Sequence, residues 1–179
     1  VLFTSGSSSN PKAVELTFSN IYNNAQGWSE AIGFDEGSKY LNILPLYHIS
    51  GISIFFRSIY FYFISIVSNY DKNKILDLIK KEDVNYVSMV PKMITDIMIV
   101  NKDKKIFETL KAVIIGGDAV SKGVYEYIYN NNINGYVSYG MTETASGVAG
   151  YWIKEAPVFK NGWIGYPHEY VSISIEQNN

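Results

Sequence analysis

The sequence predicts an α/β fold in which a mostly parallel sheet is flanked by helices. Short apolar segments rich in β-branched and aromatic residues alternate along the chain with longer segments whose apolar residues recur at helical spacing. Such alternation is typical of a parallel sheet covered by helices. The chain has 179 residues, 47% of them hydrophobic, which suffices for the core of one such domain.

The predicted strands are short apolar segments bounded by turn residues. They are residues 40–44, 64–67, 86–90, 113–115 and 136–138. The apolar stretch 49–67 is close in length to a membrane span of roughly 20 residues, but it contains Arg57. An arginine at the middle of a lipid-facing helix is costly. We therefore interpret this stretch as a buried helix followed by a buried strand, with no membrane span.

The predicted helices begin at residues that favour helix initiation. They are residues 19–32, 71–81, 91–100 and 121–129. Ser19 and Ser121 are suitable N-cap residues, and Pro91 suits a first helical turn. The second of these helices begins at Asp71 and ends on a lysine pair that complements the helix dipole.

The alternating pattern ends after residue 160. The segment 162–167 interrupts it, and residues 171–175 then alternate in polarity as a half-exposed strand does. We therefore expect residues 1–160 to form the α/β portion and residues 161–179 to begin a second β-sheet or barrel subdomain. Because the chain begins inside the strand that leads to its first polar loop, we expect it to be a fragment of one larger domain.

Composition excludes several classes of function. The net charge of −2 supplies no basic field, so nucleic acid is not expected as a partner. The absence of cysteine excludes disulfides, thiolate catalysis and zinc–thiolate sites. The same absence fits a cytoplasmic protein, which is our prediction for its location.

Polar residues gather in four loops, each placed after a predicted strand. The loops are residues 4–12, 45–51, 116–120 and 139–144. In parallel sheets, ligands bind beyond the carboxyl ends of the strands. We therefore expect these loops to share one site.

The first loop combines five hydroxyl side chains, a glycine and a lysine. Backbone N–H groups and hydroxyls in such a loop can line an anion-binding concavity, and Lys12 adds a full positive charge. No Gly-Lys-Ser/Thr follows a first glycine at the spacing of a Walker A loop. The composition therefore favours polyphosphate binding, with a serine-rich surface loop as the alternative.

Two further loops carry residues suited to a nucleotide. The segment 139–144 offers an aromatic face, a glycine turn, hydroxyls and a carboxylate for a base, phosphates and Mg²⁺. Its alternative is a helix start with Thr142 as the cap and Glu143 in the first turn. Gly116 and Gly117 let a flat ligand approach the backbone, with an ordinary tight turn as the alternative.

Two single residues are candidates for contact with a ligand. His48, at a strand-to-helix junction, can hydrogen-bond a ligand, act as a gate or transfer a proton, or it can be structural. Arg57 is the one arginine among 15 Lys and Arg residues. A planar guanidinium recognises carboxylates bidentately, and the alternative is a structural arginine capped by buried carbonyls. His168 has no supporting neighbours in the sequence and receives no role.

In order, these motifs resemble those of the acyl-adenylate-forming (AMP-binding) ligases, which include acyl-CoA synthetases, luciferases and adenylation domains of peptide synthetases. Residues 4–14 are similar to the Thr/Ser/Gly-rich run of the family that ends in Pro-Lys-Gly-Val, and 139–143 match Tyr-Gly-Met-Thr-Glu at every position. Residues 162–167 look like the Gly-x-x-Gly-x-Pro element that follows. Residues 44–51, with Arg57 nine residues past His48, look most like the o-succinylbenzoate–CoA ligase subfamily of menaquinone synthesis.

The resemblance implies ATP-dependent activation of a carboxylic acid, with o-succinylbenzoate as the first expectation. The acyl-adenylate would then pass to CoA, giving a thioester, AMP and pyrophosphate. ATP, Mg²⁺ and CoA are the implied cofactors and co-substrates, and a homo-oligomer is left open. A fatty- or aryl-acid CoA ligase is the close alternative.

Two departures from the family pattern support another alternative. Ser9 and Ala13 stand where the phosphate loop of the family carries glycines. The ribose-binding aspartate, the adenylation lysine on the C-terminal lid domain and the preceding N-terminal segment are all outside this chain. We therefore expect the isolated chain to be inactive, and a degenerate or truncated nucleotide-binding module without turnover stays open.

The resemblance also assigns roles to individual residues. The implied nucleotide-binding residues are Thr4, Ser5, Gly6, Ser7, Ser8 and Lys12 at the phosphates, and Gly116, Gly117 and Tyr139 around the adenine. Gly140 and Met141 also belong to the implied nucleotide-binding set. Thr142 is expected to contact the α-phosphate, and Glu143 to ligate Mg²⁺. His48 borders the acyl pocket and contacts the reacting carboxylate, and Ser50 and Gly51 line that pocket. Arg57 is expected to bind the distal carboxylate of the acid.

Overall fold

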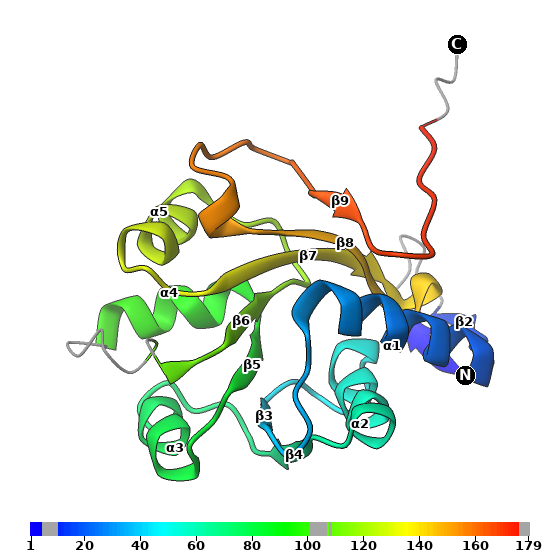
Figure 1. The fold of residues 1–179 in the computed structure, drawn as a ribbon, viewed down its shortest axis with the longest axis horizontal. Coiled ribbons are helices and arrows are strands. Elements are labelled where there is room, and N and C mark those ends of the chain that lie inside the picture. The colour runs from blue at the N-terminus through cyan, green and yellow to red at the C-terminus, as the bar shows by residue number, and fades with distance from the viewer. Residues whose placement is uncertain (5–10, 101–106, 108, 176–179) are drawn as a thin grey trace.

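A computed structural model describes residues 1–4, 11–100, 107 and 109–175 (Figure 1). The described residues form a seven-stranded sheet with the strand order β4-β3-β5-β6-β7-β8-β9. Its strands are β3 (Lys39–Asn42), β4 (Ile64–Val67), β5 (Tyr86–Met89), β6 (Ala112–Ile115), β7 (Gly135–Met141), β8 (Ser146–Trp152) and β9 (Tyr166–Pro167). Strands β3 to β7 pair in parallel, while β8 and β9 are antiparallel. The predicted mostly parallel sheet is therefore confirmed.

Helices cover both faces of this sheet. They are α1 (Phe18–Ile32), α2 (Ile49–Phe61), α3 (Ile75–Glu82), α4 (Pro91–Val100) and α5 (Lys122–Asn130), with single 3₁₀ turns η2 (Thr142–Thr144) and η3 (Ile153–Glu155). Figure 1 shows α1 and α2 on one side of the sheet and α3, α4 and α5 on the other. Two hydrophobic cores result, because neighbouring side chains of a strand point to opposite faces. On β3, Tyr40 joins the core under α1 and α2, and Leu41 joins the core under α3, α4 and α5.

The helix starts agree with the sequence in part. Ser121 caps α5 as predicted, since its hydroxyl accepts the Val124 N–H at 3.4 Å. Helix α1 begins one residue earlier than predicted, at Phe18, and its N-cap is Thr17 and not Ser19. Thr17 forms a capping box with Asn20. The prediction that a helix begins at Asp71 is wrong. Asp71 begins a turn instead, in which its side chain accepts the Asn73 N–H at 2.9 Å, and α3 starts at Ile75.

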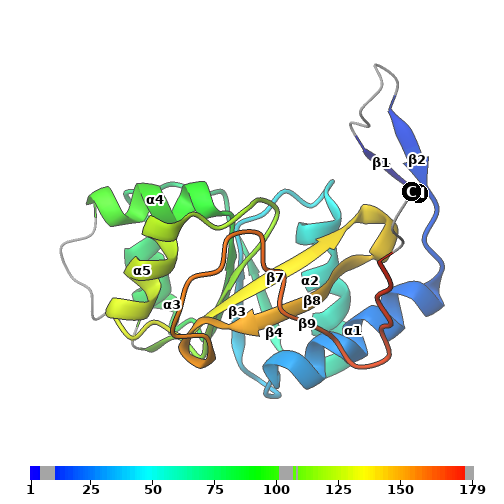
Figure 2. The ribbon, with the colours of Figure 1, turned by 90° about the horizontal axis from the view of Figure 1, so that it is seen from above.

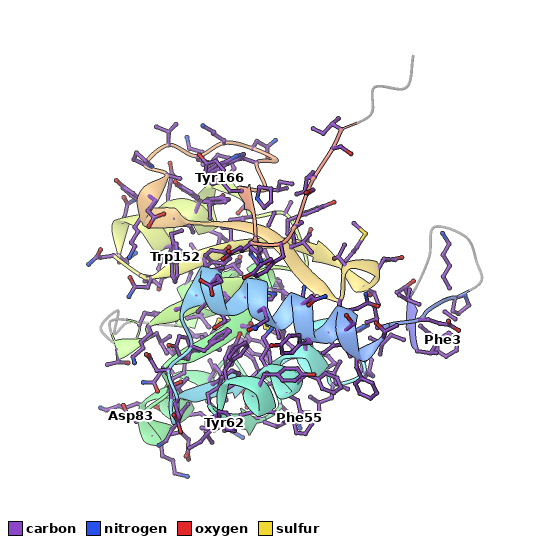
Figure 3. The ribbon with its side chains drawn as sticks, turned by 45° about the vertical axis from the view of Figure 1, so that its right-hand side comes forward. Phe3, Phe55, Tyr62, Asp83, Trp152 and Tyr166 are labelled. Carbon is purple, nitrogen blue, oxygen red and sulfur yellow. The ribbon has the colours of Figure 1, made fainter. Side chains whose placement is uncertain are left out.

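The stretch 49–67 forms the predicted helix and strand, but the prediction that both are buried is wrong. Helix α2 buries one face, whereas Phe55 on the other face is 50% exposed (Figure 3). Ile64 and Val67 of β4 are also exposed, because β4 is the edge strand of the sheet. None of the helices in the described ranges is both long and apolar enough for a membrane span.

The first loop does not follow a strand of the parallel sheet, contrary to prediction. Strands β1 (Leu2–Thr4) and β2 (Lys12–Val14) form a separate antiparallel ribbon, which projects from the main sheet (Figure 2). Residues 5–10, which connect these two strands, lie outside the described residues. The two strands pair only with one another, so the ribbon is an appendage of the α/β core.

The C-terminal part also differs from expectation. Strand β8 was not predicted, and β9 adds residues from beyond position 160 to the main sheet. The predicted strand 171–175 is wrong, since these residues have no regular secondary structure. The beginning of a second β subdomain in residues 161–179 stays a prediction.

Candidate functional site

A cavity of about 410 Å³ opens at the carboxyl ends of the parallel strands. Three of the four predicted loops contribute to it. The predicted residues that line it are His48, Ser50, Arg57, Gly116, Gly117, Gly140, Met141 and Thr142. Trp28 from α1 and Ser146 and Gly147 from β8 also line it. The structure therefore brings three of the four loops together at one cavity.

Five predicted residues with described positions lie outside this cavity. Thr4 and Lys12 are on the β1–β2 ribbon, and Lys12 is exposed. Gly51 is buried behind the cavity wall, where its carbonyl accepts a hydrogen bond from the Asn42 side chain at 2.9 Å. Tyr139 and Glu143 line neighbouring hollows. Ser5, Gly6, Ser7 and Ser8 lie outside the described residues.

A second cavity of about 370 Å³ adjoins the first. The two share Gly117, Ser138 and Gly140, and the second adds the ring of Tyr139 and the indole of Trp163. Gly117 has a φ of +81°, a left-handed conformation that favours glycine. A flat aromatic ligand suits this cavity because the aromatic residues Tyr139, Tyr151 and Trp163 line it together with glycines, whose backbone no side chain covers.

The turn after β7 presents a carboxylate to solvent. Residues Thr142–Thr144 form one 3₁₀ turn, in which the Thr144 hydroxyl accepts the Met141 N–H at 3.0 Å. Met141 is the residue before this turn, so the alternative with Thr142 as a helix cap does not hold. Glu143 is exposed, and no group of three candidate metal ligands occurs among the described residues. A metal ion at Glu143 would therefore complete its coordination with phosphate oxygens and water, as Mg²⁺ commonly does.

His48 lies at the mouth of the cavity. It is the N-cap residue of α2 without a side-chain capping bond, and its ring lies 4.6 Å from that of Tyr47. No hydrogen bond or ion pair with another described residue engages its ring nitrogens. The imidazole is thus exposed and uncommitted, which suits contact with a ligand.

Arg57 lies at the closed end of the same cavity, with only 2% of its surface exposed. Its Nη2 donates to the Ser146 hydroxyl at 3.0 Å and to the Asn24 side-chain oxygen at 3.3 Å. The guanidinium stacks on Trp28, with Cζ 4.3 Å from the ring centroid. Its Nε is buried without a hydrogen-bond partner.

The charge of Arg57 has no counter-ion among the described residues. Both acceptors are neutral, and none of the ion pairs formed by the described residues includes Arg57. Burial lowers the pKa of Arg57 to about 10, which still leaves it protonated at neutral pH. No backbone carbonyl of the described residues caps it, in contrast to the structural alternative. An unpaired buried charge is costly, so an incoming anion would be strongly favoured here.

A second buried layer supports Trp28. The ring of His168 packs edge-on against Trp28 at 5.1 Å, and its Nε2 pairs with the Tyr136 hydroxyl at 2.8 Å. Burial, followed by the charge of Arg57, lowers the pKa of His168 to about 4, so this side chain is neutral at pH 7. His168, which received no role in the sequence analysis, therefore packs against a residue that lines the cavity.

The sequence reasoning missed Asn24, Trp28 and Ser146. Asn24 and Trp28 occupy positions in a predicted helix where ordinary packing residues are expected. No motif in the neighbouring sequence indicates that they belong to a site. Ser146 had one usable signal, because it closely follows the motif 139–143. It also has an uncommon φ of +116°, which no sequence pattern reveals.

Together, these features define a class of α/β protein with adjoining cavities, one suited to a flat aromatic group and the other to an anionic ligand. Comparison with known proteins identifies the class. Residues 1–179 match the model of the AMP-binding enzyme family. The chain therefore belongs to the AMP-binding enzymes, as the motifs predicted.

Individual relatives show which members of this family the chain is similar to. The chain is 36% identical over 149 residues to the 2-succinylbenzoate–CoA ligase of Staphylococcus aureus, covering 82% of this chain and 30% of the relative. The o-succinylbenzoate CoA synthetase (MenE) of Bacillus subtilis in complex with the acyl-adenylate intermediate OSB-AMP superposes with a TM-score of 0.90 at 27% identity. The complex of the same enzyme with ATP and magnesium ion gives 0.91 at 28% identity. These matches cover 99% of this chain but only 36% and 37% of the solved chains, so the chain spans about a third of their length.

Proposed function

We propose that the whole protein of which this chain is part activates a dicarboxylic acid, with o-succinylbenzoate as the first choice. The single observation that carries the proposal is the buried, uncompensated charge of Arg57 at the closed end of the cavity. A monocarboxylic acid uses its only carboxylate in the reaction. A second carboxylate is therefore the group that would pair with Arg57.

The proposed chemistry follows from the poor reactivity of a carboxylate as an acyl donor. Attack of its oxygen on the α-phosphorus of ATP forms a mixed anhydride and releases pyrophosphate. The thiol of CoA then attacks the acyl carbon and displaces AMP, which leaves a thioester. Charge builds up on the phosphoryl oxygens in the first step, so catalysis is chiefly positioning and charge stabilisation.

Residues of this chain would divide these tasks between the two cavities. Tyr139 and the Gly116–Gly117 turn would hold the adenine, and Thr142 would contact the α-phosphate. His48 would orient the reacting carboxylate at the mouth of the first cavity, opposite Arg57. Mg²⁺, held by Glu143 when bound, would neutralise phosphate charge. The remaining nucleotide contacts would come from Lys12 and residues 4–8.

The apolar part of the cavity lining sets the expected shape of the acid. It includes Ile114, Met89, Val90 and Met93. These side chains favour an apolar body between two anionic ends. A fatty or aryl acid fits this apolar wall equally well and is the second candidate, but it would leave Arg57 unpaired.

The test is ATP–pyrophosphate exchange by the whole protein with o-succinylbenzoate, fatty acids and aryl monoacids. Exchange confined to o-succinylbenzoate would support the proposal. Exchange with monoacids alone would remove the role of Arg57 and leave an acyl-CoA ligase of another specificity. No exchange with any acid would favour a nucleotide-binding module without turnover. For the isolated 179-residue chain we propose such inactivity, and a cytoplasmic location and any homo-oligomer stay predictions.

A further inference from the structure

Asn24 of α1 connects the buried arginine to the turn that carries Thr142 and Glu143. Its side-chain oxygen accepts from Nη2 of Arg57 at 3.3 Å. Its side-chain nitrogen donates to the backbone carbonyls of Thr144 at 3.2 Å and Gly147 at 2.8 Å. One half-buried amide of α1 therefore connects α2, the last residue of the η2 turn and β8. Helix α1 packs against both α2 and β8 in the fold.

The two carbonyls fix the orientation of this amide. An amide nitrogen donates two hydrogen bonds and accepts none, so the atom that faces Thr144 and Gly147 must be the nitrogen. The side-chain oxygen therefore faces Arg57, and an amide flip, which would exchange oxygen and nitrogen, would lose both hydrogen bonds to the carbonyls. Asn24 thus presents a fixed, neutral acceptor to the guanidinium.

A neutral acceptor at this position preserves the charge that the proposed substrate needs. With Asn24 and Ser146 accepting, both N–H groups of Nη2 are used, whereas Nε and Nη1 keep their donors free of described partners. A carboxylate in place of the amide would pair with the guanidinium and cancel its charge. Trp28 limits movement of the guanidinium on one flat face, 4.3 Å away.

We propose that Asn24 is a positioning residue that determines specificity for the second carboxylate of the acid. It holds Arg57 in a single orientation with its charge unpaired, and it sets the distance between that charge and the Thr142–Thr144 turn. This inference rests on the proposed function, since it assumes that the whole protein activates a diacid.

The experiment measures pyrophosphate exchange by the whole protein with o-succinylbenzoate and with its monoamide, in which the carboxylate that is not activated has become a neutral amide. Asn24→Ala removes the acceptor, and we expect it to raise the KM for the diacid by roughly tenfold, as loss of a hydrogen bond to a charged group would. The KM values for the monoamide and for ATP should change less. Asn24→Asp should raise the KM for the diacid further and invert the preference toward the monoamide.

Asn23→Ala is the matched control, because Asn23 is the neighbouring, exposed residue of the same helix. It should leave the ratio of the two KM values unchanged. If Asn24→Asp does not fold, Asn24→Ala alone carries the test. Equal changes in both acids would overturn the inference and make Asn24 merely structural.

Arg57→Lys in the same assay separates the two proposals. If Arg57→Lys removes the preference for the diacid and the Asn24 variants do not, only the positioning role of Asn24 fails. If wild type shows no preference for the diacid, the proposed function itself fails.

Discussion

The proposed ligand-binding region has two ends, a proposed acid end around Arg57 and a proposed nucleotide end around Tyr139, and they are built differently. At the acid end, Arg57 and Trp28 are each 2% exposed and are held by contacts from three elements of the fold. At the nucleotide end, Tyr139 is 42% exposed, and Glu143 is exposed as well. The acid end is therefore organised before any ligand arrives. The side chains of the nucleotide end face solvent and would acquire their partners from the ligand.

This difference predicts which substitutions separate function from stability. A change at the exposed end should affect turnover and leave the fold intact, because the side chain packs against little. A change at the buried end should affect both, because the same contacts hold the fold and the guanidinium.

The largest expected effect is at the exposed end. Glu143→Gln in the whole protein should lower the rate of adenylation by about a hundredfold or more, because it removes the proposed metal ligand. The melting temperature should stay within error of wild type. Pyrophosphate release and thermal unfolding measure the two quantities, and unchanged pyrophosphate release would refute the assignment.

Arg57→Lys should have the next largest effect. We expect the KM for the diacid to rise about tenfold to a hundredfold, because an ammonium cannot replace the planar guanidinium on Trp28. The KM for ATP should rise much less, since the nucleotide end does not contact Arg57. Steady-state kinetics with each substrate varied in turn would show the split. Equal increases in both KM values would contradict the role of Arg57.

Gly147→Ala tests the packing that holds Trp28 in place. A Cβ at this position would lie 2.5 Å from Cζ2 of Trp28 and would collide with the Ser138 hydroxyl. Overpacking of this kind costs roughly 1–3 kcal/mol of stability and should weaken diacid binding by displacing the indole. Denaturant unfolding measures the first effect.

The matched control is Gly123→Ala in α5, where an added Cβ meets nothing within 4 Å. Alanine there should leave stability unchanged or raise it slightly. If Gly147→Ala were as well tolerated as this control, the tight packing around Trp28 would not hold.

The smallest expected effect concerns pH. The folded pKa of His168, about 4, is below its ordinary value of 6.5, so the unfolded chain takes up a proton first as the pH falls. This contribution to stability is complete above pH 6.5 and is lost progressively between pH 6.5 and about 4. His168→Gln should flatten the pH dependence of the unfolding free energy in this window. An unaltered slope would show that other groups cause it.

The same contrast explains what the sequence could predict. The exposed end is encoded locally: residues 139–143 stand together in the chain, and β7 delivers them to the cavity. The buried end is encoded at long range. Asn24 donates hydrogen bonds to Thr144 and Gly147, which are 120 and 123 positions away in the sequence. No local sequence pattern predicts such contacts.

Strands could be predicted where the pattern of apolar side chains determines strand formation. They could not be predicted where pairing with a neighbouring strand determines it. Strand β8 contains Gly147 and Gly150, which weaken any strand signal, yet it forms because β7 offers its free edge. Residues 171–175 alternate as a strand should but have no pairing partner among the described residues. The burial of β4 was overestimated because its apolar composition does not reveal an edge position.

The central claim is that the charge of Arg57 receives the second carboxylate of the acid. The most direct measurement compares kcat/KM for o-succinylbenzoate and its monoamide in the wild-type whole protein and in Arg57→Met. We predict a preference for the diacid of about tenfold or more in wild type and nearly none in the variant, as expected for one charge-assisted hydrogen-bonded pair. The same preference in both proteins would contradict the claim.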